Sequence, residues 1–316
     1  MNARTVLGVA AGIVGGAALS NRLLANRAGG LESRLPGVER NYRWRGIDIE
    51  YTVAGEPTDP DMLLLHGIHA GASSDEFEPV FERLADQYHV IAVDLPGFAR
   101  SERPPLVYSP TLYADFVRDF ASDVTDEPIV VASSLTGSFA VDAADETTFD
   151  SLVLICPTDE TRDERPRLRS LLRTPLVGTT LYNALASKPS IEYFYDRDGY
   201  YDSDRLETET IDYAWRSAHQ PGARYAPASF VAGSLDPDFD LATKLASLET
   251  PTTLVWGRDA ELVSLRDGRD LAEAADLELV VIDYATQLPH VEHPEKFAEY
   301  LSAELVHSDL ESGRDE

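Results

Sequence analysis

Side chains suited to nucleophilic and acid–base chemistry follow short apolar runs at several places in this chain. They are the hydroxyls of Ser133 and Ser134, the imidazoles of His66, His69, His290 and His293, and the carboxylates of Asp259 and Glu261. A neutral serine hydroxyl is a poor nucleophile unless an adjacent base accepts its proton. The chemistry open to this chain therefore depends on whether one of the imidazoles can reach a serine.

The elements that must position these groups can be predicted from hydrophobic periodicity. Six short apolar runs without alternation indicate strands that are buried on both faces, as in a parallel sheet. The runs are residues 62–65, 90–93, 129–131, 152–155, 252–255 and 279–282, and the amphipathic segments among them predict helices over residues 76–86, 112–124, 138–145, 266–275 and 295–305. Residues 42–44 and 47–51 alternate around a Gly and predict an opening antiparallel hairpin. Ser73 and Glu76 have the spacing of a capping box for the first helix.

This rhythm breaks between Ile155 and Thr252. Residues 158–248 combine helical patterns with an aromatic cluster at 193–195 and 200–201. Long insertions at the carboxyl edge of a parallel sheet commonly roof a ligand site. We therefore predict an α/β fold, a mostly parallel sheet flanked by helices, with an inserted helical cap. The chain would divide into an apolar N-terminal segment with a linker (1–40), a core (41–157 and 249–308), the cap (158–248) and an acidic tail (309–316).

Four segments, which together span residues 42–305, resemble the α/β-hydrolase family. Residues 63–68, Leu-Leu-Leu-His-Gly-Ile, resemble its strand-His-Gly loop, and the resemblance assigns one N–H of an oxyanion hole to Ile68. Residues 93–101 resemble its Asp-x-Pro-Gly-x-Gly-x-Ser turn, which marks the fold and not the chemistry. The matches to structural positions of these two motifs are His66, Gly67, Pro96 and Gly97, and Ala99 stands where the family has a second glycine.

Residues 130–137 resemble the nucleophile elbow of the family, a Gly-x-Ser-x-Gly turn between a strand and a helix. Ser134 fits this pattern better than Ser133, because Ala132 then occupies the first flanking position. Thr136, which is bulkier than the usual glycine, occupies the second. The resemblance therefore assigns the nucleophile position to Ser134, the second oxyanion N–H to Leu135 and a structural role to Gly137.

The residues at the family's base and acid positions differ from the family pattern in this chain. Its C-terminal signature has a His before Leu-Pro, and in residues 286–294 that position is held by Gln287. A glutamine amide cannot take a proton near neutral pH. The family acid stands three residues after the Gly of a Trp-Gly turn, and in residues 254–265 that position is Ala260. Because the acid serves to orient the His and stabilise its cation, the two losses support one another.

The favoured interpretation is a degenerate hydrolase that binds a small hydrophobic acyl or carbonyl ligand, or acts as a scaffold. The alternative is an active serine hydrolase of the carboxylic-ester type that uses a relocated base, so sequence alone leaves open whether the chain is an enzyme. His69 is the better substitute, since its loop faces the elbow, whereas His290 matches an extra His that packs against the body in the resembling sequences. A one-residue loop shift could bring Asp259 or Glu261 into the acid position, although solvated loop carboxylates are the simpler interpretation.

Charge and cysteine content limit the other functions. The 316 residues include 55 acidic and 27 basic side chains, and the net charge of −28 repels phosphate backbones, which argues against nucleic-acid binding. Dispersed acidity with only three lysines is typical of proteins from salt-loving organisms, where salt screens the self-repulsion. Cys156 follows an apolar run, so we expect a buried structural thiol. We predict neither a cofactor nor a bound metal.

The N-terminal segment has its own character. Residues 5–21 contain no charged side chain and are rich in Ala, Val, Leu and Gly. A spanning helix needs about 20 apolar residues, so a membrane anchor, a signal peptide and a packed helix are all open, with the anchor favoured. The arginines on its C-terminal side, Arg22, Arg27, Arg34 and Arg40, would keep the main domain cytoplasmic. We expect a cytoplasmic protein with membrane contact through residues 5–21.

Overall fold

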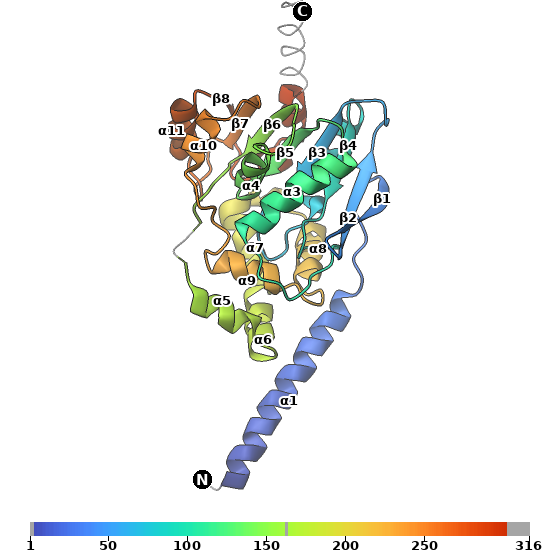
Figure 1. Cartoon of the computed structure of the whole chain (residues 1–316). Coiled ribbons are helices and arrows are strands. Elements are labelled where there is room, and N and C mark those ends of the chain that lie inside the picture. Colours follow the sequence, from blue (N-terminus) through green and yellow to red (C-terminus); the bar gives the residue numbers. More distant parts are fainter. Residues whose placement is uncertain (1–2, 162–163, 302–316) are drawn as a thin grey trace, which may run out of the picture.

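The centre of the structure, a computed structural model that describes residues 3–161 and 164–301, is an eight-stranded sheet (Figure 1). The strand order is β1-β2-β4-β3-β5-β6-β7-β8; the pairs β1–β2 and β2–β4 are antiparallel, and the other five pairs are parallel. The strands are β1 (Val38–Trp44), β2 (Ile47–Ala54), β3 (Asp61–Leu65), β4 (His89–Val93), β5 (Ile129–Ser133), β6 (Ser151–Ile155), β7 (Thr252–Gly257) and β8 (Glu278–Ile282). The predicted α/β fold and its opening hairpin are confirmed.

Both faces of the sheet are covered, which explains why its strands are continuously apolar. Alternate residues of β3 belong to opposite clusters, Leu63 and Leu65 to one and Met62 and Leu64 to the other. The first cluster contains residues of α3 (Pro110–Val124), α4 (Thr136–Ala143) and α11 (Leu265–Ala275), and the second contains residues of α2 (Glu78–Ala85) and of the helical residues 294–301. Residues 62–65 of β3 thus bury their side chains on alternate faces of the sheet, each face covered by helices.

The predicted helical insertion lies between β6 and β7, as expected. It comprises α5 (Pro166–Arg173), α6 (Val177–Leu185), α7 (Lys188–Phe194), a π-helical turn (Tyr195–Gly199), a 3-10 turn (Ser203–Arg205), α8 (Thr208–Ala218), α9 (Tyr225–Val231) and α10 (Leu241–Ala246). Leu241 and Leu245 of α10 belong to the first apolar cluster, so the last helix of the insertion packs on the body. The other helices cover the carboxyl edge of the sheet, where β5 and β7 end (Figure 1).

The N-terminal helix α1 (Ala3–Ala28) extends from this cap end of the molecule (Figure 1). Its last turns pack on the cap: Ala28 is buried with Ile191 and Trp215, and Leu24 lies against the same cluster. Among the described helices, none is long and apolar enough to cross a membrane. A membrane anchor over residues 5–21 stays a prediction.

The predicted capping box is wrong. Ser73 precedes a short 3-10 helix (Ser74–Phe77) and makes no side-chain cap, and α2 begins at Glu78, with Pro79 in its first turn. Glu76 consequently lies in the 3-10 helix before α2, and its side chain does not cap α2. The predicted acidic tail, residues 309–316, lies outside the described residues.

Candidate functional site

The strand-to-helix turn after β5 holds Ser134 in a left-handed backbone conformation. Its φ is +55°, a region that costs a non-glycine residue about 1–2 kcal/mol. Two hydrogen bonds hold it there: Ser134 N–H donates to the carbonyl of Ile155 (2.8 Å), and Gly137 N–H donates to the carbonyl of Ser134 (3.0 Å). Ser134 is partly exposed, whereas Ser133 is buried. The turn therefore presents the hydroxyl of Ser134 and not that of Ser133.

Crowding explains which residues flank the serine. A Cβ at Gly137 would lie 3.1 Å from the Cβ of Pro157, so this position favours glycine. The bulkier Thr136 is accommodated because its hydroxyl donates to the carbonyl of His66 at 2.8 Å. The residue that departs from the elbow pattern thus ties the elbow to the neighbouring strand-His-Gly loop.

That loop lies directly against the elbow. A Cβ at Gly67 would be 3.3 Å from Ser133 Oγ and 3.6 Å from Ser134 Cβ. In the described part of the chain, the N–H groups of Ile68 and Leu135 have no hydrogen-bond acceptor, although both residues are buried. Buried N–H groups are nearly always paired, so two unpaired ones beside Ser134 are suited to a ligand oxygen.

His66 is a structural residue in this loop. Its Nδ1 lies 2.7 Å from the carbonyl of Gly67, which requires a donor, and its Nε2 lies 3.1 Å from the N–H of Leu95, which requires an acceptor. These two contacts select one neutral tautomer. Burial also lowers the pKa of His66. The ring has no free lone pair and joins the loop to the Asp94–Gly97 turn.

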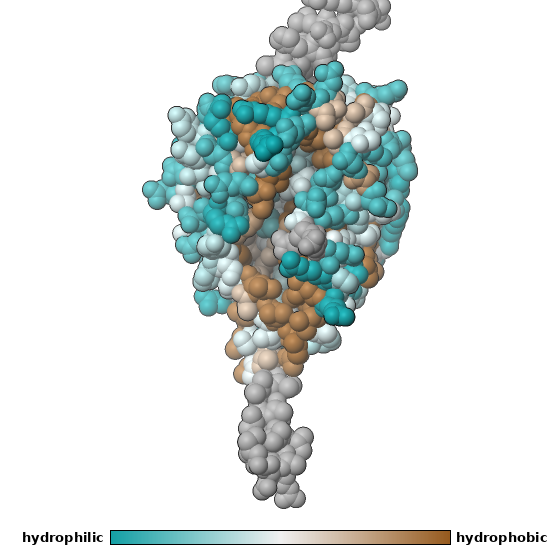
Figure 2. Space-filling model, turned by 90° about the vertical axis from the view of Figure 1, so that its left-hand side faces the viewer, coloured by the Kyte–Doolittle hydropathy of each residue, from teal (hydrophilic) through white to brown (hydrophobic). Residues whose placement is uncertain are grey.

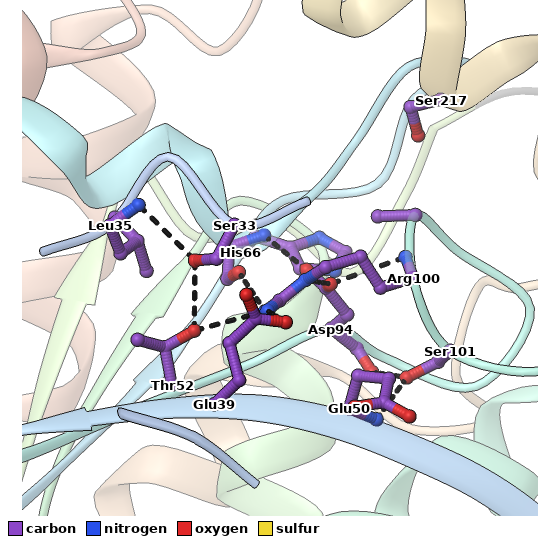
Figure 3. Close-up of polar contacts among 12 residues, drawn as sticks. Ser33, Leu35, Glu39, Glu50, Thr52, His66, Asp94, Arg100, Ser101 and Ser217 are labelled. Atoms are coloured by element: carbon purple, nitrogen blue, oxygen red, sulfur yellow. Dashed lines mark hydrogen bonds and ion pairs between the residues drawn. The ribbon is translucent and has the colours of Figure 1, made fainter. Parts of the chain in front are cut away.

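A buried ion pair braces the same turn. Asp94 accepts a hydrogen bond from Ser74 N–H at 2.8 Å. It also accepts from Arg100 Nε at 2.6 Å, and Ser101 Oγ donates to the Asp94 carbonyl (Figure 3). Although burial opposes ionisation, Arg100 holds the pKa of Asp94 below its usual range. The carbonyl of Pro96 accepts from the Tyr113 hydroxyl, and Gly97 has a φ of +92° that only glycine adopts readily. The turn is therefore held rigidly and contacts the strand-His-Gly loop through His66.

The side chain of Gln287 contacts the loop that contains Ala260. The amide nitrogen of Gln287 donates to the carbonyl of Val263 at 3.3 Å, in the loop after β7. The methyl group of Ala260 is buried in that same loop, while its neighbours Asp259 and Glu261 are exposed. The loop of Gln287 thus contacts the loop of Ala260, and neither of these two side chains exchanges protons near neutral pH.

His290 lies in the interior of the body. Its side chain is 0 % exposed, and its ring lies against Phe77 and Phe297. Its Nε2 is 3.2 Å from Oε1 of Glu76, close enough for an ion pair although the angle is outside hydrogen-bond geometry. The second ring nitrogen has no partner among the described residues. This packing directs His290 toward Glu76.

Glu76 is a site residue that the sequence did not single out. Its Oε2 accepts the N–H of Gly67 at 3.0 Å. Burial opposes its ionisation, but His290 and the adjacent Ser133 hydroxyl outweigh that effect and lower the pKa of Glu76. The carboxylate therefore holds the backbone of the strand-His-Gly loop at Gly67. The Ser-x-x-Glu spacing that suggested a helix cap was the only local signal, and it could not reveal a long-range role.

His69 lines a cavity between the loop and the cap. Other lining residues are Ser73, Glu76, Tyr195, Tyr200, Tyr213 and Leu288. Its ring stacks on Phe194, and its Nδ1 accepts the N–H of Gly71 at 3.2 Å. Burial lowers the pKa of His69 to about 4, so the ring is neutral at pH 7 and carries its proton on Nε2. In this tautomer His69 is a hydrogen-bond donor and not a base.

Two remaining predictions concern reactive or metal-binding side chains. Cys156 is buried, and burial raises the pKa of its thiol to about 12, so the predicted structural thiol agrees with its surroundings. Within the described ranges, no group of three or more His, Cys, Asp or Glu side chains could hold a metal ion.

Comparison with known proteins identifies the family. The sequence model of the alpha/beta hydrolase family matches residues 62–300, which is most of the chain. The chain belongs to the α/β-hydrolase family. It is 23 % identical to the uncharacterized hydrolase YugF of Bacillus subtilis over 83 % of this chain and 96 % of that protein. It is 24 % identical to a 2-hydroxy-6-oxo-6-(2'-aminophenyl)hexa-2,4-dienoic acid hydrolase of Metapseudomonas resinovorans, over 83 % of this chain and 88 % of the relative.

Solved structures agree with this α/β-hydrolase assignment. A serine hydrolase involved in carbazole degradation superposes with a TM-score of 0.70 at 21 % identity, covering 85 % of this chain and 99 % of that one. At such low identity the superposition shows the fold, a mostly parallel sheet with helices and an insertion between β6 and β7.

Proposed function

We propose that this α/β-hydrolase binds a small acyl or carbonyl compound without hydrolysing it. The proposal rests on Gln287, whose amide stands where the family sequence has its base and donates to the carbonyl of Val263. Ser134 keeps the backbone of a nucleophile, but three candidate bases are committed to other contacts. His66 uses both ring nitrogens, His69 presents an N–H, and His290 is turned toward Glu76.

The expected loss of rate follows from these contacts. Without a base and its acid, the oxyanion hole and substrate binding together retain only about 10³–10⁴-fold acceleration over water. Working esterases need several orders of magnitude more. The remaining machinery is therefore suited to holding a carbonyl oxygen and not to cleaving the bond beside it.

The nature of the ligand follows from the unpaired N–H groups next to Ser134 and from the residues of the cavity that His69 lines. The N–H groups of Ile68 and Leu135 and the Nε2–H of His69 are donors that suit a carbonyl or carboxylate oxygen. The tyrosine rings of the cap supply apolar walls. One relative is named as a hydrolase of an oxo-dienoic acid, which is a carbonyl compound of this kind.

The decisive experiment measures covalent reactivity and binding in the same sample. The purified chain and Ser134→Ala are incubated with a fluorophosphonate probe and with p-nitrophenyl butyrate, and octanoate binding is followed by ligand-observed NMR. We expect no Ser134-dependent labelling or turnover, and octanoate binding that weakens in His69→Phe, which keeps the ring stacking but loses the donor. Turnover that disappears in Ser134→Ala would establish the active hydrolase instead.

A gain-of-function variant tests the cause of the inactivity. Gln287→His with Ala260→Asp restores both missing groups on loops that already meet, so we expect Ser134-dependent ester hydrolysis to appear. Gln287→Asn with Ala260→Asp is the matched control, because it adds the acid without a base. Equal activity in the two double variants would show that Gln287 is not the base position.

The surface charge supports a further proposal, that the protein works in molar salt. A net charge of −28 with acidic residues dispersed over the chain gives strong self-repulsion at low ionic strength. At 1 M salt the screening length falls to about 3 Å, so the repulsion is largely removed.

A further inference from the structure

One end of the molecule is built from two segments that are far apart in the sequence. Asn21 of α1 donates through Nδ2 to Thr180 Oγ1 (3.0 Å) and accepts from Asn183 Nδ2 (3.0 Å), which joins α1 to α6. The short hairpin of α5 and α6 and the last turns of α1 therefore form one surface at the cap end (Figure 1). We call it the cap-end surface.

This surface is apolar. The side chains of Leu19 (60 % exposed) and Leu23 (57 %) on α1 and of Leu171 (43 %), Val177 (59 %) and Leu185 (52 %) on α5 and α6 face solvent. Figure 2 shows hydrophobic residues gathered at this end, around the place where the helix leaves the body. Large apolar side chains that are exposed together on a soluble body mark an interaction site.

The same surface is the cationic part of a very acidic protein. Residues 1–31 and 165–191 contain no Asp or Glu, although the chain has 55 of them. The two segments together carry seven arginines and one lysine. Within the described ranges, no salt bridge involves the side chains of Arg22, Arg27, Arg165, Arg167 or Arg169, so their charges are available to a partner.

We propose that the cap-end surface docks on an anionic lipid bilayer, with its apolar side chains in the interface and its arginines at the headgroups. Charge complementarity selects this occupant, since basic residues near a membrane surface attract anionic lipid and amphipathic surfaces insert their apolar side chains shallowly. In a dimer through this surface, two identical positive surfaces would face and repel each other, so a second copy of the chain is disfavoured. The docking is interfacial, in agreement with the absence of a spanning helix among the described residues.

The test is flotation of the full-length chain with lipid vesicles. Vesicles of phosphatidylcholine with about one-third phosphatidylglycerol are compared with pure phosphatidylcholine, at the lowest salt at which circular dichroism shows the chain folded. We expect the protein to float with the anionic vesicles, and each Arg→Ala change at 167 or 169 to weaken binding by roughly fivefold. This charge effect should shrink as salt is raised.

Val177→Glu and Val38→Glu form the matched pair for the apolar contribution. Both valines are more than half exposed (59 % and 52 %), but Val38 pairs with Val53 at the edge of the sheet opposite the cap. Val177 is the first residue of α6, where a glutamate favours the helix, so the variant should fold. We expect Val177→Glu to lose at least about tenfold in vesicle affinity and Val38→Glu to bind as the parent does.

Three results would overturn the proposal. They are the absence of flotation with anionic vesicles, equal binding by the two valine variants, or a parent dimer in light scattering that Val177→Glu alone converts to a monomer. The last result would assign the surface to a second copy of the chain. None of these measurements depends on whether Ser134 is reactive.

Discussion

Replacing Glu76 tests the buried contact that holds the strand-His-Gly loop. Glu76→Gln keeps an oxygen that can accept the Gly67 N–H, now 3.0 Å away, but removes the charge beside His290. A hydrogen bond to a charged group contributes about 1.5–3 kcal/mol, so we expect a loss of about 2 kcal/mol in the free energy of unfolding. Glu76→Leu also leaves the Gly67 N–H and His290 without a partner, and breaking a buried pair in this way costs about 3–5 kcal/mol.

The assay is urea unfolding at constant high salt, since a non-ionic denaturant leaves the screening unchanged. Glu78→Gln is the control, because it removes an equal charge from an exposed position at the start of α2. Its effect should stay within about 0.5 kcal/mol. If Glu76→Gln unfolds at the same urea concentration as Glu78→Gln, Glu76 does not support the loop electrostatically and the reasoning fails.

Three further outcomes follow from the geometry. Ser134→Gly should stabilise the fold by about 1 kcal/mol by relieving the φ of +55°, seen as a higher melting temperature, while Ser138→Gly in the interior of α4 should not stabilise it. His69 has a folded-state pKa of about 4, below its unfolded value, so the unfolded chain binds more protons between pH 4 and about 6.5 and stability rises with pH there. His69→Phe should flatten this slope in urea midpoints at pH 4.5 and 7, and an unchanged slope would contradict the assignment. Raising KCl from about 0.1 M to 2 M should raise the melting temperature, because the net charge of −28 is then screened; a falling melting temperature would argue against adaptation to salt.

Local sequence determined the architecture because each strand and helix carries its own periodicity. Continuous apolar runs predict strands covered on both faces, and residues 62–65 do contact helices on both sides of the sheet. The chemistry of Gln287 and Ala260 likewise depends only on residue type, since neither side chain can accept a proton near pH 7 in any fold. The helical insertion was predictable for the same reason, as a break in the repeating pattern.

Only the tertiary structure decided how the remaining polar groups are used. Sequence favoured His69 over His290 as a substitute base, but the structure shows that the Nδ1 lone pair of His69 is occupied by Gly71 N–H and that His290 is buried against Glu76. The spacing of Ser73 and Glu76 is compatible with a helix cap, and it is equally compatible with a carboxylate that accepts the Gly67 N–H. The joining of α1 to α6 depends on Asn21 reaching residues about 160 positions away. Tautomer, burial and long-range partners arise from packing between distant segments, and one segment's sequence does not contain them.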